Sequence, residues 1–219
     1  MKYINIILFS FLGAALGAAL VNGIASMKRG GQTPIRLVLA GAAVSTLLVA
    51  MSQGIALYFN VAQSIMFWTV GGVAGSNWEQ VRIMLPWIIG GLIGSVALSP
   101  YISILSLGQD AAKGLGINIK VVNLLSSVIV LILVGASVSV VGSVGFVGLI
   151  VPHIARFFVG MDYKLIIPST AVMGALLVVL ADLGARILSP PFETPIGAII
   201  SLIGVPLFLN LARRQRSAI

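Results

Sequence analysis

Long apolar blocks separated by short polar connections run through the whole of this sequence. Seven blocks can be drawn, over residues 4–27, 36–58, 82–103, 119–141, 146–160, 165–188 and 196–212. Most of them reach the ~20 residues that a helix needs to cross the hydrocarbon core of a membrane. Only 8% of the residues are charged, against about 25% in a soluble domain. The sequence therefore predicts an all-α, polytopic membrane bundle of about seven transmembrane helices, forming a single transmembrane domain over 1–219.

The placement of the cations predicts how the chain is oriented. Ten of the thirteen Lys and Arg residues fall in one set of alternate connections, and only Lys2, Arg82 and Arg186 fall on the opposite side. Because Lys and Arg accumulate in cytoplasmic connections, the richer side, which includes the C-terminus, is predicted to be cytoplasmic. The net charge of +8 is then an orientation signal, and we expect no nucleic-acid partner. An odd number of spans puts Met1 outside, so we expect further membrane helices to precede this chain in the intact protein.

Two connections are expected to be structured. On the outer side, 63–75 is apolar but broken by glycines, and its Met66, Phe67 and Trp68 suit a short helix at the interface or one that folds back into the protein. On the inner side, 106–118 is polar and rich in small residues. That composition is typical of a short exposed helix ended by glycine.

The segment 145–156 places Pro152, His153 and Arg156 inside apolar sequence. Lipid tolerates such residues only where protein or a cavity surrounds them, so the segment indicates a functional interior. It is short, it follows a glycine-rich start that includes Gly145, and Pro152 is expected to kink or begin its helix. His153 is the only histidine and the chain has no cysteine, so we expect no metal site and a ring bonded to a helix carbonyl.

Asp182 and Arg186 stand four residues apart and so share one helix face near the outer end of the sixth block. They are expected to form an internal ion pair that lowers the cost of charge near lipid, or to leave Arg186 available at the outer mouth to an acidic partner. Glu193 lies in a proline-rich outer turn, where a proton-relay role is disfavoured. The chain lacks a phosphate-binding loop and a Ser/His/Asp set, so we expect no enzyme activity and no cofactor.

Four stretches, in order along the chain, resemble elements of one known family. They are SLGQDAAKGLG at 106–116, GFVGLIVPHIAR at 145–156 continuing into Gly160-Met-Asp162, ADLGAR at 181–186, and ETPIG at 193–197. Together they resemble the FecCD/vitamin B12-type permeases, the transmembrane half of ABC importers for iron–siderophores, haem and cobalamin. Two departures are Gln109-Asp110, where the family usually has Glu one position earlier, and Thr194, where it usually has Leu. Members of the family carry ten helices, so the seven blocks would be helices four to ten.

The resemblance implies a permease subunit of a binding-protein-dependent importer in a bacterial cell membrane. It would form the translocation pathway for a metal-chelate substrate, paired with a second permease subunit as a homodimer or heterodimer. Its further partners would be cytoplasmic ATP-binding subunits, which would hydrolyse ATP, and an extracellular or periplasmic substrate-binding protein.

The resemblance also implies roles for individual residues. Arg186 would dock the binding protein, and Gly145, Pro152, His153, Arg156 and Asp182 would belong to structural motifs. The inner gate would contain Gln32, Thr33 and Pro34, and the outer gate would contain Met66, Phe67 and Trp68. The segment 106–118 would couple to the ATPase through Leu107, Gly108, Ala111, Ala112, Gly114, Leu115 and Gly116.

Two alternatives stay open at this point. One is an ion-coupled secondary transporter or channel that uses Asp182 and Glu193, although relays need several ionisable groups in register. The other is a truncated permease fragment that is inactive alone, because the missing helices would form part of the pathway.

Overall fold

The computed structural model describes residues 2–26, 34–73, 75–188 and 194–216. Within these ranges every regular element is an α-helix. The helices are α1 (Lys2–Ser26), α2 (Pro34–Tyr58), α3 (Ala62–Val70), α4 (Trp78–Ser106), α5 (Gln109–Gly114), α6 (Ile119–Val141), α7 (Val147–Val159), α8 (Tyr163–Leu188) and α9 (Ile196–Arg216).

The all-α membrane bundle expected from the apolar blocks is confirmed. Each of the seven blocks falls on one helix, and the two structured connections form α3 and α5. Five of the helices, α1, α2, α4, α6 and α8, are long and apolar enough to cross a membrane. The other two, α7 and the apolar part of α9 (Ile196–Leu207), are shorter. The protein is therefore a multi-pass membrane protein.

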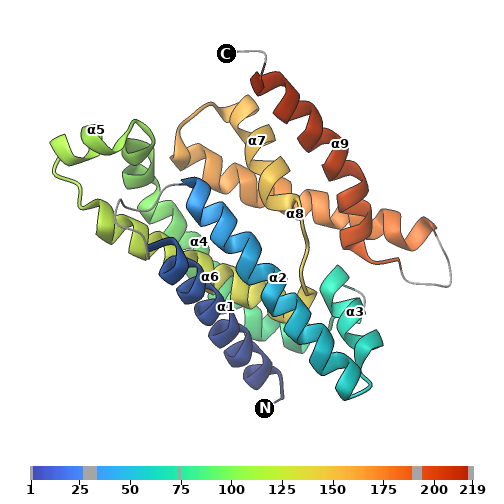
Figure 1. Ribbon diagram of the computed structural model, residues 1–219. Coiled ribbons are helices and arrows are strands. Elements are labelled where there is room, and N and C mark those ends of the chain that lie inside the picture. Colours follow the sequence, from blue (N-terminus) through green and yellow to red (C-terminus); the bar gives the residue numbers. More distant parts are fainter. Residues whose placement is uncertain (1, 27–33, 74, 189–193, 217–219) are drawn as a thin grey trace.

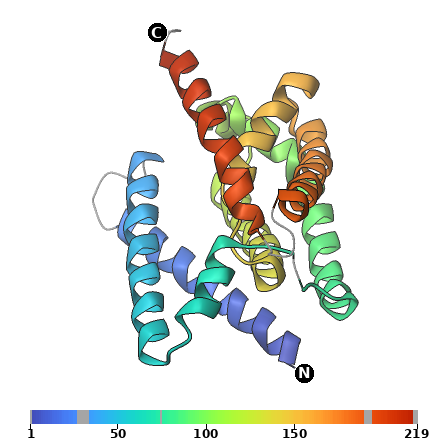
Figure 2. The same ribbon diagram turned by 90° about the vertical axis from the view of Figure 1, so that its right-hand side faces the viewer.

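The connections alternate between two ends of the bundle. At one end lie α5, the α7–α8 turn and the end of α9, and at the opposite end lie the N-terminus and α3 (Figures 1 and 2). We call these the α5 end and the α3 end. Lys113 in α5, Lys120 at the start of α6 and Lys164 at the start of α8 all lie at the α5 end, which is the alternation that the charge pattern predicted.

Side-chain caps mark where several helices begin. Asn77 and Gln80 form a capping box at α4, in which each side chain accepts a backbone N–H of the other residue at 3.0 Å. Asn118 caps α6 by accepting the N–H of Val121 at 3.3 Å. Such caps satisfy amides that a helix leaves without partners in its first turn. They fix the start of α4 at the α3 end and of α6 at the α5 end.

Small residues set the packing between helices. Ala181 and Ala185 of α8 meet Ile196 and Ile200 of α9 in a buried apolar cluster. At Gly135 of α6, the missing Cβ leaves room for the ring of Phe11 from α1. This ring also packs edge-on against Trp87 of α4, with the centroids 5.1 Å apart. Close approach through small residues is how helices associate in lipid.

Most large apolar side chains face outward from this chain. Phe9, Val38 and Leu202, for example, are 71%, 71% and 79% exposed. Holding such side chains in water instead of burying them would cost about 1.5–3 kcal/mol each. The outer surface is therefore suited to lipid or to other membrane helices.

Candidate functional site

The end of α3 is held by backbone contacts with the connection that follows α6. The Ser143 N–H donates to the Trp68 carbonyl at 3.3 Å, and the Ser143 hydroxyl donates to the Thr69 carbonyl at 3.0 Å. The Gly72 N–H donates to the Val141 carbonyl at 2.8 Å. Helix α3 therefore folds back against the protein at its C-terminal end, while the side chains of Met66 and Trp68 stay 69% and 49% exposed.

Glycines make this close approach possible. Gly142 has φ 73°, and a Cβ there would collide with the Trp68 carbonyl oxygen. A Cβ at Gly197, in the first turn of α9, would collide with the Val70 carbonyl oxygen. The C-terminal carbonyls of α3 thus lie directly against two other backbones, where a larger residue would not fit.

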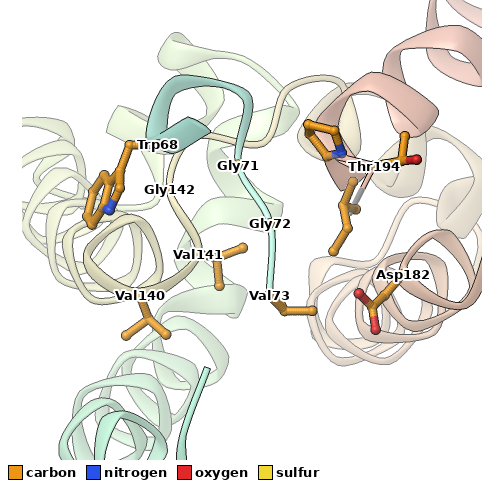
Figure 3. A pocket seen from close by; sticks show the side chains of 11 residues that line it. Trp68, Gly71, Gly72, Val73, Val140, Val141, Gly142, Asp182 and Thr194 are labelled. Carbon is orange, nitrogen blue, oxygen red and sulfur yellow. The ribbon is translucent and has the colours of Figure 1, made fainter. Parts of the chain in front are cut away.

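A pocket of about 230 Å³ lies beside this crossing (Figure 3). Its lining comes from α3, α6, α8, the segment 71–73 and the start of α9. Asp182 and Thr194 place polar side chains on it. Sites that enclose drug-sized ligands usually measure about 300–1,000 Å³, so this pocket is too small to enclose a bulky chelate.

Asp182 and Arg186 form the ion pair that their spacing predicted. The Arg186 Nε donates to Asp182 Oδ2 at 2.9 Å, and the Arg186 side chain is 65% exposed while that of Asp182 is 24% exposed. An ion pair of this exposure contributes about 0–1 kcal/mol to stability. The predicted ion pair is confirmed, and availability of the exposed guanidinium to an acidic partner stays a prediction.

The segment between α4 and α6 forms a short exposed helix at the α5 end. Gly108 precedes it with φ 120°, and Gly116 follows it with φ 75°, so glycines bound it on both sides. Ala112 is fully buried, and Leu107 and Leu115 are 75% and 66% exposed. Ala111, Gly114 and Gly116 are exposed as well. The helix therefore buries one alanine, while Leu107 and Leu115, which flank it, stay exposed.

The proline-containing segment starts as irregular backbone, as predicted. Phe146 precedes α7 in the left-handed region with φ 66°, after Gly145, and Pro152 lies inside the helix. His153 is exposed, and in the described part of the chain its ring makes no bond to a helix carbonyl, so that expectation is wrong. The ring lies on an outward face of α7, so no buried acceptor reaches it.

Arg156 lies near the end of α7 and reaches the start of α8. Its Nη2 donates to the Tyr163 hydroxyl at 2.9 Å, and its guanidinium lies 5.6 Å from the centre of the Tyr163 ring. Arg156 therefore braces the α7–α8 turn.

Several predicted residues cannot be placed against this geometry. Gln32, Thr33 and Glu193 lie outside the described residues, and the side chain of Phe67 does too. Pro34 is the first residue of α2. The proposed inner gate therefore stays a sequence-based prediction.

Sequence reasoning missed a polar contact at the α5 end. The Ser103 hydroxyl of α4 donates to Asp162 Oδ1 at 3.3 Å, and the Tyr163 N–H donates to Ser103 Oγ at 3.1 Å. The role of Asp162 could have been predicted, because Asp is a typical N-cap residue and this one stands directly before an apolar helix. Nothing local in the sequence indicates Ser103 as its partner.

Comparison with known proteins adds to this geometry. Residues 1–214 match the FecCD transport family. The chain is 50% identical, over 99% of its length, to the iron(3+)-hydroxamate import system permease protein FhuB of Bacillus subtilis (strain 168), of which it covers 56%. It is 43% identical, over 96% of its length, to the Fe(3+)-citrate import system permease protein YfmD of the same organism, of which it covers 63%.

A solved structure is also similar. It shows an inward-facing conformation of a metal-chelate type ABC transporter, with a TM-score of 0.79 and 32% sequence identity over 95% of this chain and 65% of that chain. The chain thus spans between about half and two thirds of the length of these relatives.

Proposed function

Because this chain belongs to the FecCD transport family, we propose that it is a transmembrane permease subunit of a binding-protein-dependent ABC importer and forms part of the pathway for a metal chelate. Relatives are named for iron(3+)-hydroxamate and Fe(3+)-citrate, and another, 36% identical over 93% of this chain, is a cobalamin import system permease protein of Halobacterium salinarum. The substrate proposed here is accordingly an iron–siderophore, haem or cobalamin-type chelate.

The observation that carries the proposal is the position of α5. It lies between the end of α4 and the start of α6, and the leucines that flank it, Leu107 and Leu115, are exposed. We propose that the segment 106–118 docks into a cytoplasmic ATP-binding subunit, which hydrolyses the ATP. Because the methyl group of Ala112 is buried, the segment is packed against the permease. Movement of the ATP-binding subunit against its outer face would therefore move α4 and α6.

The α3 end would contact the substrate-binding protein, on the opposite side of the membrane from the ATP-binding subunit. Arg186 is exposed there and would pair with an acidic side chain of the substrate-binding protein. Met66, Phe67 and Trp68 of α3 would belong to the outer gate, and Gln32, Thr33 and Pro34 to the inner gate. Access would alternate through partner-driven rocking of helix bundles around the pathway.

The pocket beside α3, of about 230 Å³, is too small for a chelate, and a larger one of about 510 Å³ lies between α1, α2 and α6. The pathway for a chelate would be shared with a second permease subunit. The proposed location is a bacterial cell membrane with the α5 end in the cytoplasm, in agreement with the cations there.

Transport by reconstituted vesicles tests this function. The complex captured through this chain is placed in proteoliposomes with ATP inside and an iron(3+)-hydroxamate-loaded binding protein outside. We expect uptake that requires hydrolysable ATP. Uptake driven by an ion gradient without ATP would support the secondary transporter instead, and the absence of any co-purified ATPase would support an inactive fragment.

A further inference from the structure

One polar cluster ties the end of α4 to the turn between α7 and α8. Ser103 Oγ donates to Asp162 Oδ1 at 3.3 Å and accepts the Tyr163 N–H at 3.1 Å. The same serine hydroxyl therefore contacts both residues at the start of α8, 59 and 60 positions further along the chain. We call Ser103, Asp162 and Tyr163 the α4–α8 link.

Asp162 of the link also caps the N-terminus of α8. Asp162 Oδ1 accepts the Lys164 N–H at 3.0 Å, and its carbonyl accepts the Ile166 N–H at 2.9 Å. Asp162 is thus the cap of α8 as well as the acceptor of the α4 hydroxyl. A movement of Ser103 consequently acts on the first turn of α8 and not only on its side chains.

The two helices that meet at the link lead to different functional ends. Ser103 lies one helical turn before Leu107, where the proposed coupling segment begins, and the Ser106 hydroxyl donates back to the Ser103 carbonyl at 2.6 Å. Helix α8 runs from the link to Arg186 at the α3 end. Its 26 residues give it a length of about 39 Å.

The hydrogen bonds of the link fix the relative position of α4 and α8 more sharply than the apolar packing that also joins the two helices. The hydrophobic effect is non-directional, so burial alone sets the relative position of two helices less sharply than directional bonds do. Hydrogen bonds depend steeply on distance and angle, and they hold one register. The link therefore adds directional bonds to the packing that holds α4 and α8 together.

We propose that Ser103 is a positioning residue that makes the coupling segment and α8 move together, so that docking of the binding protein at Arg186 is felt by the ATPase. The proposal rests on the proposed function, since it needs both partners.

The test is the ATPase activity of the complex captured through this chain, in proteoliposomes, with and without loaded binding protein. Ser103→Ala removes the hydroxyl and leaves the Asp162 cap of Lys164 in place. We expect basal ATPase activity close to that of the wild type. The stimulation ratio, which is the activity with loaded binding protein divided by the activity without it, should fall about twofold or more. Ser103→Thr, which keeps a hydroxyl, should restore the ratio.

Ser95→Ala is the matched control. Ser95 lies in the same helix, and its hydroxyl donates at 2.8 Å only to the Gly91 carbonyl of its own helix, so its loss should leave the ratio unchanged. If Ser103→Ala prevents assembly, Ser103→Cys, which is slightly larger and supplies a weaker donor, should lower the ratio while the complex persists.

The outcomes separate the inference from the function on which it rests. If binding protein stimulates the wild type and the ratio is unchanged in the Ser103 variants, the transmitting role of Ser103 is overturned. That role is also overturned if basal and stimulated rates fall in proportion and Ser103→Thr does not restore them, because Ser103 is then structural. A wild type that shows no stimulated ATPase activity overturns the proposed function itself.

Discussion

Arg186 donates through Nε to Asp182 Oδ2 at 2.9 Å, and 65% of its side chain is nevertheless exposed. The carboxylate one turn earlier holds the guanidinium by its near edge. The outer edge of the guanidinium, with its two terminal nitrogens, can then meet a planar carboxylate of a partner in a two-bond arrangement. Asp182 therefore orients the Arg186 guanidinium and partly balances its charge.

Reversal of this charge should weaken docking of the substrate-binding protein. Arg186→Glu would place two carboxylates one turn apart and would repel an acidic partner. We expect the affinity measured by surface binding to the reconstituted complex to fall about tenfold or more at low ionic strength, and less in high salt. Asp182→Asn keeps an oxygen acceptor for Nε and should cost less. Equal affinity of wild type and Arg186→Glu at low salt would leave Arg186 with a structural role only.

Bulk on the outer face of the coupling segment should uncouple the ATPase without harm to the permease. Gly114 is exposed, and a Cβ there meets nothing within 4 Å. Gly114→Trp is therefore expected to insert and fold normally but to abolish ATP-driven uptake. Ala112→Trp is the contrasting variant, because Ala112 is fully buried and a large ring there should lower the amount of folded protein. Normal uptake by Gly114→Trp would remove the segment from the ATPase contact.

Substitution of the glycine beneath α3 should destabilise the fold. Gly142→Ala would put a methyl group against the Trp68 carbonyl and hold alanine at φ 73°. A residue forced into that region costs about 1–3 kcal/mol, so the unfolding temperature in detergent should fall. Gly184→Ala is the matched control, since Gly184 lies inside α8, four residues before its end, and a Cβ there meets nothing within 4 Å. Its unfolding temperature should be unchanged or higher, and identical midpoints for the two variants would refute the steric argument.

Those parts of the fold that depend on local sequence were predictable. A block of apolar residues is helical in lipid because its backbone must bond internally, and its length alone indicates whether it spans. The short helices α3 and α5 also followed from local composition, as did the Asp182–Arg186 pair from its spacing. Each of these predictions uses residues within one or two helical turns of each other.

Contacts between distant segments were not predictable in this way. Ser103 and Asp162 are 59 positions apart, and a serine in an apolar helix usually bonds to its own backbone, as Ser95 does. The wrong expectation for His153 has the same origin. Whether a ring meets a carbonyl depends on which face of α7 is covered by α8 and α9, and one sequence does not contain that information.

Helix α7 is short, and the backbone that leads into it has a consequence for how the protein is made. Its 13 residues extend only about 20 Å, and irregular backbone from Gly142 to Phe146 precedes them. Hydrogen bonds across this stretch join it to the end of α3, where Thr69 is 74 positions upstream of Ser143. When α3 leaves the ribosome, the residue that will bond its last carbonyls has not yet been synthesised. The contacts that hold the end of α3 therefore form only after α4, α5 and α6 have been synthesised.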